Sequence, residues 1–289
     1  MINKVACIGA TGMLGKPVAV HLVQAGFSVS ALVRNMKGSS TILPKEVNRI
    51  QGDIRNPEDV DRLLQGQDAV YISLSVPQTE KESAWHSETD GMKIILASAK
   101  RNSIQRIMVL SSLVQRYQGM NNFKWWVFDI KEQSNLMVKQ SGIPYTIFYP
   151  STFMESFLGK YKQGSRILIS GKSEYPMYFI SGEDFGKQVG KALQIQTSVN
   201  REYVIQGPEP ILGDEAARIF VMHYKKEKLS VTSAPFGLLK FFANFSSTLK
   251  YGIHIIEALN RYPEKFESET AWQELGKPEM TLKQFAETR

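Results

Sequence analysis

The sequence has few of the features that mark secreted and membrane proteins. It has one cysteine, Cys7, among 289 residues, so the chain cannot form an internal disulfide bond. No uncharged apolar run approaches the roughly 20 residues that a membrane-spanning helix requires. The N-terminus leads directly into an apolar segment and lacks the pattern of a signal peptide. We therefore expect a cytoplasmic protein that does not attach to a membrane.

Patterns for metal and nucleic-acid binding are also missing. The four histidines have no metal-ligand spacing among themselves or with Cys7. The net charge is +7, but no dense basic run is interleaved with aromatic residues as nucleic-acid binding favours. We therefore expect no metal and no nucleic acid, and we expect a small-molecule substrate.

The most informative stretch is the glycine-rich segment at residues 9–15, which follows the apolar run at residues 5–8. The run predicts a buried strand, and the apolar spacing after the glycines predicts a helix. Gly9 permits a tight turn, Gly12 lets the backbone approach a phosphate, and Gly15 lets the helix lie near the sheet. A glycine-rich turn at this place predicts a dinucleotide diphosphate site. The residues expected to contact the cofactor here are Gly9, Thr11, Gly12, Met13, Leu14 and Gly15.

The second predicted strand, residues 28–33, ends in Arg34. An acidic residue here would bind the adenosine ribose and favour NAD, and none is present. Arg34 instead offers a forked donor for a 2′-phosphate, so we expect NADP, with NADPH preferred over NADH. The alternative is that Arg34 is an ordinary solvated residue at the end of a strand.

Strands and helices alternate up to residue 150, which predicts an α/β fold with a doubly wound parallel sheet. Ligands of such sheets bind outside the carboxyl ends of the strands. Asp53 follows one such strand, and its alternative role is that of a turn or cap residue. The further residues expected at the cofactor are Asp53, Ile54, Ser73, Leu74, Ser75, Ser111, Lys131, Tyr149, Pro150 and Ser151.

Several motifs together resemble the atypical short-chain dehydrogenases, and most closely their NmrA-like and isoflavone-reductase-like branch. They are Gly9-Ala-Thr-Gly12-Met-Leu-Gly15, Leu32-Val33-Arg34, Gly52-Asp53, and Lys131 followed by Gly142-Ile143-Pro144-Tyr145-Thr146. The resemblance implies a Rossmann domain for NAD(P) at residues 1–150. A smaller, mostly helical substrate domain would follow at residues 151–289. Segments around 179–190 and 201–207 would return to the Rossmann sheet.

The catalytic residues depart from the usual pattern of these enzymes. Typical members have a Tyr-x-x-x-Lys pair, and the residue four positions before Lys131 is Val127. The isoflavone-reductase-like branch also lacks that tyrosine and keeps the lysine, so Lys131 remains the catalytic candidate. The wider family places an oxyanion-holding hydroxyl near Ser111 and Ser112, and we include Ser112 as catalytic. Tyr117, in the neighbouring loop, is a further candidate that could supply a phenol in place of the missing tyrosine.

Three functions are compatible with these residues. The first is NADPH-dependent reduction of a small apolar carbonyl, enone or quinone. The second is a redox-sensing regulator that binds the nucleotide without turnover, which the missing tyrosine favours. The third is a nucleotide-sugar epimerase, which usually requires that tyrosine as a general acid. The protein is expected to be a monomer or a homodimer.

Overall fold

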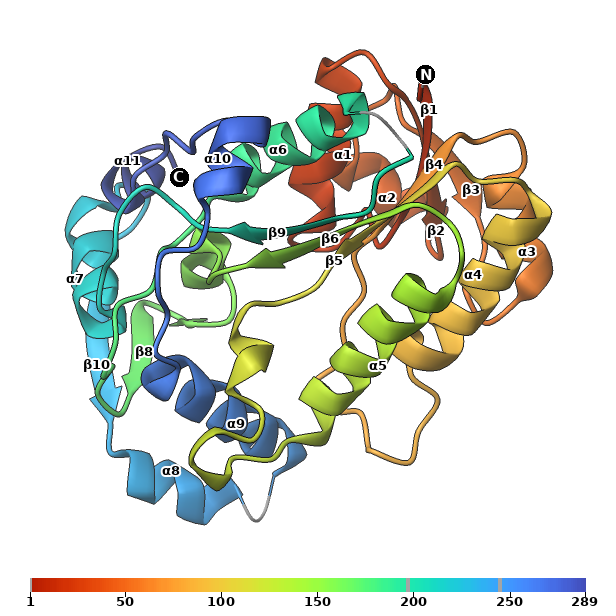
Figure 1. The fold of residues 1–289 in the computed structure, drawn as a ribbon. Coiled ribbons are helices and arrows are strands. Elements are labelled where there is room, and N and C mark those ends of the chain that lie inside the picture. Colours follow the sequence, from red (N-terminus) through yellow and green to blue (C-terminus); the bar gives the residue numbers. More distant parts are fainter. Residues whose placement is uncertain (1, 196–197, 244–245) are drawn as a thin grey trace.

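The computed structural model describes residues 2–195, 198–243 and 246–289 (Figure 1). Within these residues the main sheet has seven strands, all parallel, in the order β3-β2-β1-β4-β5-β6-β9. The order reverses between β1 and β4, which is where ligands of doubly wound sheets bind. The strands are β1 (Lys4–Ile8), β2 (Ser28–Val33), β3 (Asn48–Gln51), β4 (Ala69–Ile72), β5 (Arg106–Leu110), β6 (Tyr145–Pro150) and β9 (Arg201–Ile205).

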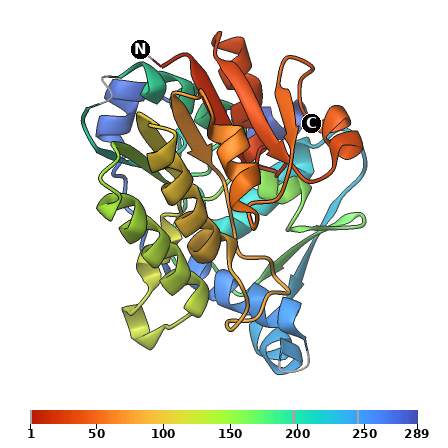
Figure 2. The same ribbon diagram turned by 90° about the vertical axis from the view of Figure 1, so that its right-hand side faces the viewer.

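The central strands are apolar on both sides because helices cover both faces of the sheet. Every residue of β4 and β5 is buried, as is all of β1 after its first residue. One helix layer contains α1 (Gly15–Gln24) and α6 (Gly182–Gln194), and the other contains α3 (Pro57–Leu64), α4 (Met92–Arg101) and α5 (Trp126–Gln140) (Figures 1 and 2). A short helix, α2 (Met36–Ile42), connects β2 to β3. The predicted fold class, a doubly wound parallel sheet, is confirmed.

Close contact between α1 and α6 depends on a glycine. A Cβ at Gly186 would lie 2.7 Å from Cδ2 of His21 and 3.0 Å from the carbonyl oxygen of Pro17. Before α6, Ile180 forms an isolated parallel bridge with Phe153, which lies just after the end of β6. Residues 179–190 therefore return mainly as a helix on the face of the sheet, whereas β9 extends the sheet beside β6.

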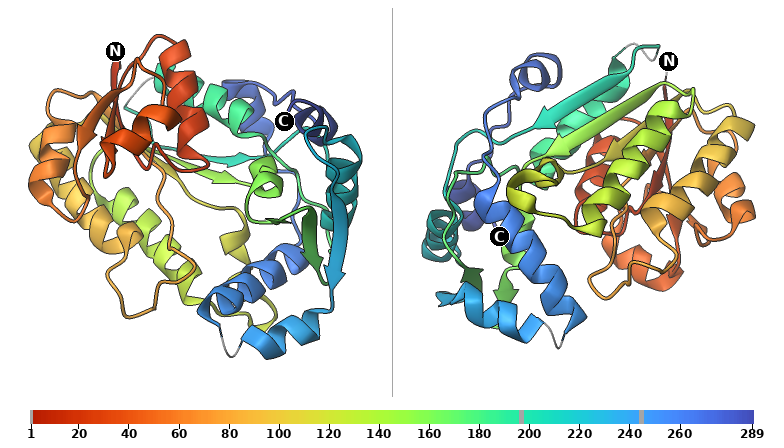
Figure 3. Two further views of the ribbon diagram at one scale, coloured as in Figure 1. Left: turned by 180° about the vertical axis from the view of Figure 1, so that it is seen from behind. Right: turned by 60° about the horizontal axis from the view of Figure 1, so that its bottom comes forward.

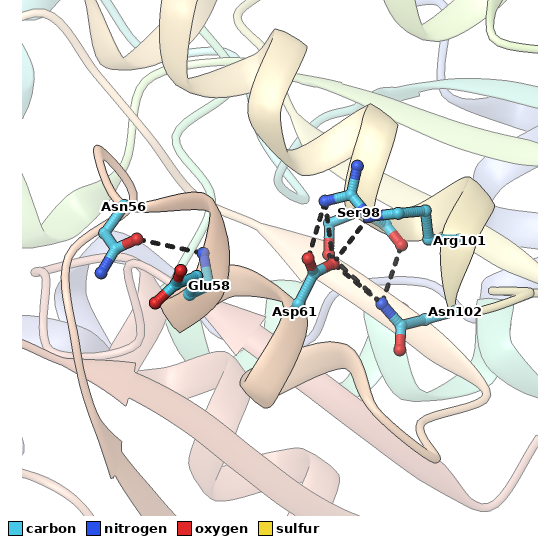
Figure 4. Close-up of polar contacts among 6 residues, drawn as sticks. All are labelled: Asn56, Glu58, Asp61, Ser98, Arg101 and Asn102. Atoms are coloured by element: carbon cyan, nitrogen blue, oxygen red, sulfur yellow. Dashed lines mark hydrogen bonds and ion pairs between the residues drawn. The ribbon is translucent and has the colours of Figure 1, made fainter.

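A polar cluster joins α3 to α4 (Figure 4). The carboxylate of Asp61 on α3 pairs with Arg101 at 2.8 Å and accepts a hydrogen bond from Asn102 at 3.1 Å. Ser98 also donates to Asp61. Asn56 caps the start of α3 by accepting from the N–H of Glu58 at 3.1 Å. The contacts of Asp61 hold the two helices together, and the cluster lies outside the region expected to bind the cofactor.

The C-terminal elements gather on the side toward which β6 and β9 point (Figures 1 and 3). A second sheet has the order β10-β8-β7 and its own hydrophobic core around Phe157, Phe179 and Phe220. The strands are β7 (Lys162–Gln163), β8 (Arg166–Ser170) and β10 (Ser230–Ala234). The helices are α7 (Gly213–His223), α8 (Phe236–Phe242), α9 (Ser247–Arg261), α10 (Glu269–Leu275) and α11 (Leu282–Glu287).

Short 3₁₀ and π-helical segments connect these elements: η1 (Ser87–Gly91), η2 (Val114–Tyr117), η3 (Met120–Asn122) and η4 (Met154–Leu158). The helix expected from residue 87 begins as the π-helix η1 and continues as α4, a distortion that is frequent at functional sites. Among the described residues, no helix is both long enough and apolar enough to cross a bilayer.

Candidate cofactor and substrate site

The glycine-rich turn packs so tightly that larger residues would not fit. Gly9 has φ +83°, and a Cβ there would lie 2.0 Å from the carbonyl oxygen of Ser73. A Cβ at Gly15 would lie 2.1 Å from the carbonyl oxygen of Gly9, and one at Gly12 would lie 3.2 Å from the same oxygen. The turn is closed by a hydrogen bond of 3.0 Å from the N–H of Gly12 to the carbonyl of Gly9. We call residues 9–15 the glycine corner.

The first turn of α1 is open to an anion. No side chain caps the helix at Leu14, and the first turn contains no acidic residue. Thr11, Gly12 and Met13 are exposed, and Leu14 is half-buried. Because unpaired N–H groups and the helix dipole attract negative charge, this geometry fits a diphosphate.

A cavity of about 380 Å³ lies at the ends of β2 and β3, and Arg34 and Asp53 both line it. The Arg34 side chain is exposed and has no carboxylate partner among the described residues. The Oδ1 atom of Asp53 accepts a hydrogen bond from the N–H of Arg55 at 2.9 Å. The Asp53 side chain therefore stabilises the turn after β3, as aspartate often does in turns, and it also lines the same cavity as Arg34.

Asp59 also lines this cavity, which the sequence analysis missed. Its Oδ2 atom accepts from the N–H of Asp53 at 2.9 Å, and its Oδ1 pairs with Arg62 at 2.6 Å. The hydrogen bond from Asp53 and the contact with Arg62 lower the pKa of the Asp59 carboxyl. An acidic residue in the first turn of a helix is common, so the sequence offers no sign that this one reaches the cavity.

The loop after β4 connects two parts of the site. The carbonyl of Ser73 lies against Gly9, and the N–H of Val76 donates to Oε2 of Glu88 at 3.0 Å. Leu74 is half-buried against the core, whereas Ser75 is exposed. Ile54 lies near η1, because a Cβ at Gly91 would be 3.0 Å from Cδ1 of Ile54.

Lys131, in the second turn of α5, forms a buried ion pair with Glu88 of η1. The side chains are 13% and 5% exposed, respectively. Both carboxylate oxygens of Glu88 accept hydrogen bonds: Oε1 from the ammonium of Lys131, and Oε2 from the N–H of Val76. The sequence analysis missed Glu88 because the pair spans 43 positions and joins two separate helices.

Other residues occupy the neighbourhood of the missing tyrosine. Val127 is buried in the core one turn before Lys131. Tyr117 is fully buried, and its phenol oxygen accepts a hydrogen bond from Asn121 at 3.3 Å, so it does not face a substrate. Tyr251 of α9 is only partly buried, and its ring packs against Trp125 with centroids 4.8 Å apart. Burial and the charge of Glu88 raise the pKa of Tyr251 to about 12.

The serines after β5 differ in their surroundings. The Ser111 hydroxyl accepts from Nδ2 of Asn135 at 2.8 Å and donates to Oε1 of Gln115 at 3.3 Å. Ser112 is half-buried, and no side-chain hydrogen bond involves it in the described part of the chain. Asn135, which the sequence analysis missed, lies one turn after Lys131, and its buried Oδ1 atom has no partner among the described residues. Ser111, Gln115 and Asn135 therefore form a second polar cluster between the end of β5 and α5.

The polar groups at the end of β6 form hydrogen bonds with other residues of the protein. The hydroxyl of Tyr149 donates to Glu202 at 2.9 Å, and that of Ser151 donates to Glu264 at 2.9 Å. The carbonyl of Pro150 accepts from the N–H of Leu113 at 2.9 Å. The cofactor contacts predicted for Tyr149, Pro150 and Ser151 would be made by groups that already have one hydrogen-bond partner within the protein.

The fold and the glycine corner define a doubly wound α/β protein with an open, glycine-rich turn at the switch point of its sheet. The model of the NmrA-like family matches residues 1–279, and the chain therefore belongs to the NmrA-like family. The resemblance seen in the sequence is confirmed.

Individual relatives are distant. The chain is 23% identical over 256 residues to the Photosystem II assembly factor Ycf39 of Trieres chinensis, covering 87% of this chain and 78% of the relative. It is 26% identical over 238 residues to a (4-alkanoyl-5-oxo-2,5-dihydrofuran-3-yl)methyl phosphate reductase of Streptomyces griseus. That match covers 80% of this chain and 79% of the relative. An NADPH-dependent quinone oxidoreductase from Escherichia coli, solved with NADPH, has a similar fold: its TM-score is 0.75, with 16% identity and coverage of 98% of both chains.

Proposed function

We propose that this protein is an NADPH-dependent reductase of a small carbonyl, enone or quinone. One observation carries the proposal: the loop after β4 contacts the glycine corner through Ser73 and the Lys131–Glu88 pair through Val76. A site for a diphosphate and a buried ammonium are thereby held at the same edge of the sheet. That arrangement supports a nucleotide placed beside a group that stabilises negative charge.

The choice of NADPH rests on Arg34. Its guanidinium borders the cavity at the ends of β2 and β3 and has no carboxylate partner among the described residues, so it is available to a 2′-phosphate. Asp59 is the acid in the same cavity that could favour NADH instead. Its carboxylate is already occupied by the N–H of Asp53 and by Arg62, which supports the assignment to Arg34.

The side chains supply the remaining chemistry. Bound NADPH would provide the hydride. The Lys131 ammonium would stabilise the negative charge that develops on the acceptor oxygen, and Glu88 would hold that ammonium in place. Tyr251, which packs against Trp125, would be the proton donor; its phenol is protonated at neutral pH like that of any tyrosine, and the pKa raised to about 12 makes it a weaker acid than a free tyrosine.

The relatives support reduction without fixing the substrate. The Streptomyces griseus relative is named as a reductase, and the Escherichia coli structure is named as a quinone oxidoreductase with NADPH. Val127 argues against a nucleotide-sugar epimerase, since that chemistry usually requires a tyrosine at this position. We propose a small-molecule substrate for a protein that is a monomer or a homodimer.

A nucleotide-binding role without turnover is the second candidate. It is favoured by the absence of a tyrosine at position 127 and by similarity to proteins named as assembly factors. An acceptor screen separates the two. NADPH consumption would be followed with naphthoquinone, menadione, cinnamaldehyde and a simple aldehyde, and NADPH and NADP⁺ binding would be titrated by tryptophan fluorescence. Turnover with at least one acceptor supports the reductase. Selective nucleotide binding without turnover of any acceptor would support the regulator.

A further inference from the structure

We propose that residues 77–86 form a pH-sensitive latch beside the candidate site, which doubly protonated His86 holds closed and which opens when His86 loses a proton. We call these residues the His86 loop. The latch itself does not depend on the proposed function. Its effect on turnover, which acts through Lys131, rests on the proposed reductase function.

The His86 loop leaves the site and returns to it. It begins directly after Val76, whose N–H donates to Glu88, and it ends at His86, the N-cap residue of η1. Residues 81–84 are exposed, and the loop, orange in Figure 1, projects below α5 in that view. Main-chain hydrogen bonds of 3.0 Å form two turns within the loop. These turns do not fasten the loop to the rest of the protein.

The ring of His86 does fasten it. His86 is only 5% exposed. Its Nδ1 atom contacts Oε1 of Glu80, and its Nε2 atom lies 2.9 Å from the carbonyl oxygen of Glu82. The ring also packs on Trp126, the first residue of α5, with centroids 5.2 Å apart. One side chain therefore joins the loop to the helix that carries Lys131.

The hydrogen-bond pattern requires the charged form of His86. Both ring nitrogens face oxygen atoms, one of a carboxylate and one of a carbonyl, and such oxygens accept hydrogen bonds without donating. Neutral imidazole has a single N–H, so it donates to Glu80 or to Glu82 but not to both. The imidazolium donates to both. Loss of one proton therefore removes one of the two bonds that close the loop.

The charges around His86 favour the protonated ring. Glu80 of the loop and Asp90 of η1 are both acidic, and Oδ2 of Asp90 accepts from the main-chain N–H of His86 at 3.0 Å. Lys93 of α4 offsets part of this charge by pairing with Asp90 at 3.3 Å, and α5 contributes the neutral ring of Trp126. Hydrogen bonds and the acidic charges outweigh burial, so the pKa of His86 is raised above 6.5. The latch therefore opens as the pH rises above 6.5.

Opening of the loop would reach Lys131 through Glu88. Oε2 of Glu88 accepts from the N–H of Val76 just before the loop, and Oε1 pairs with Lys131. Glu88 itself lies in η1, two positions after His86. An open loop would release both attachments of this carboxylate from their fixed positions. Lys131 would then be held less precisely at the candidate site.

Trypsin cleavage after Lys81, in the exposed part of the loop, measures opening without turnover. Fragments of the full-length protein without nucleotide would be followed by mass spectrometry from about pH 5.5 to about pH 9. Each rate would be divided by that of a small lysine peptide, which corrects for the pH dependence of trypsin. Cleavage after Lys131, within α5, would report unfolding of the whole protein.

Three variants separate the parts of the latch. His86→Gln removes the titrating ring. Glu80→Gln replaces the paired carboxylate by an amide, which is able to donate to a neutral ring. Glu82→Gln is the matched control, because His86 contacts the main-chain carbonyl of Glu82 and not its carboxylate.

We expect cleavage after Lys81 to be slow below pH 6.5 and to rise with pH until the closed-state pKa is passed. Because opening releases one proton, the rise is about 10-fold for each pH unit that separates the pKa values of the closed and open loop. His86→Gln should be cleaved at a constant rate, above that of the wild-type protein at low pH. Glu80→Gln should show a smaller rise, and Glu82→Gln should match the wild-type protein.

Three results would overturn the latch. They are the same pH profile in His86→Gln and the wild-type protein, an equal change in Glu80→Gln and Glu82→Gln, or cleavage after Lys81 and Lys131 that rises in parallel. If an acceptor is reduced, kcat should fall over the pH range in which cleavage rises, and an unchanged kcat would contradict the link to Lys131. Absence of turnover would contradict the proposed function alone, because proteolysis decides the latch without it.

Discussion

Glu88 and Lys131 form a buried ion pair that joins η1 to α5 at the carboxyl edge of the sheet. The second oxygen of Glu88 accepts from the N–H of Val76, so one carboxylate fixes both the lysine and the loop after β4. A buried pair of this kind positions its charges more than it adds stability.

Removing one partner of the pair should destabilise the protein more than removing both. Glu88→Gln and Lys131→Met each leave a buried polar or charged group without its partner, and we expect each to lower the free energy of unfolding by about 3 kcal/mol. The free energy of unfolding of the double variant should fall by much less than the sum of the losses in the two single variants. Urea unfolding of the four proteins gives the coupling energy, and additive losses would show that the pair does not interact in solution.

Lys131→Met should lower turnover far more than nucleotide affinity. Loss of a preorganised group that stabilises developing charge costs about 100-fold in kcat. We expect NADPH affinity to change only a few-fold. Lys139→Met is the matched control, since Lys139 lies on the same helix but pairs with Glu202 at 2.8 Å. Steady-state kinetics and calorimetry check both quantities, and an unchanged kcat would remove Lys131 from the reaction.

Arg34→Ala should reduce NADPH affinity selectively. A charge-assisted hydrogen bond contributes on the order of 1.5–3 kcal/mol, which corresponds to roughly 10- to 100-fold in Kd. NADH affinity should remain nearly constant, and Arg34→Lys should retain part of the NADPH affinity. Fluorescence titrations with both nucleotides provide the comparison. Equal losses for NADPH and NADH would contradict the assignment of Arg34 to the 2′-phosphate.

His86 should make the stability of the protein depend on pH. Burial lowers its pKa, but hydrogen bonds to the carbonyl of Glu82 and the carboxylate of Glu80 outweigh this effect, and the pKa is raised above its ordinary value of 6.5. Because the pKa is higher in the folded state, protonated His86 stabilises the folded protein. This stabilisation is complete below pH 6.5 and is lost as the pH rises through the folded-state pKa. Thermal unfolding should show that His86→Gln flattens this dependence. A parallel pH profile for the wild-type protein and the variant would refute the role of His86.

Local sequence patterns predicted the fold and the glycine corner well. The glycine spacing, the buried first strand and the amphipathic helix lie within one short segment, so their geometry follows from neighbouring residues. A Cβ at Gly15 would lie 2.1 Å from the carbonyl oxygen of Gly9, just after the end of β1, which agrees with the expectation that Gly15 lets the helix lie near the sheet. Arg34 was placed correctly at a strand end for the same reason, because the end of β2 could be read from its alternation.

Contacts between distant segments could not be predicted in this way. Glu88 is recognisable as the partner of Lys131 only after η1 and α5 pack together. Tyr251 packs against Trp125 only because α9 folds back from the C-terminal part. Asp59 resembled an ordinary first-turn residue until β3 and α3 placed it in the cavity with Arg34. A single sequence contains no direct signal for such pairings, since they depend on tertiary packing.

The most direct test of the whole account is a crystal structure of the protein with NADPH. We predict diphosphate oxygens within hydrogen-bond distance of main-chain N–H groups at the start of α1, with the 2′-phosphate at Arg34 and the nicotinamide toward Lys131. NADPH bound elsewhere, or a glycine corner still without a nucleotide at saturating NADPH, would contradict the account.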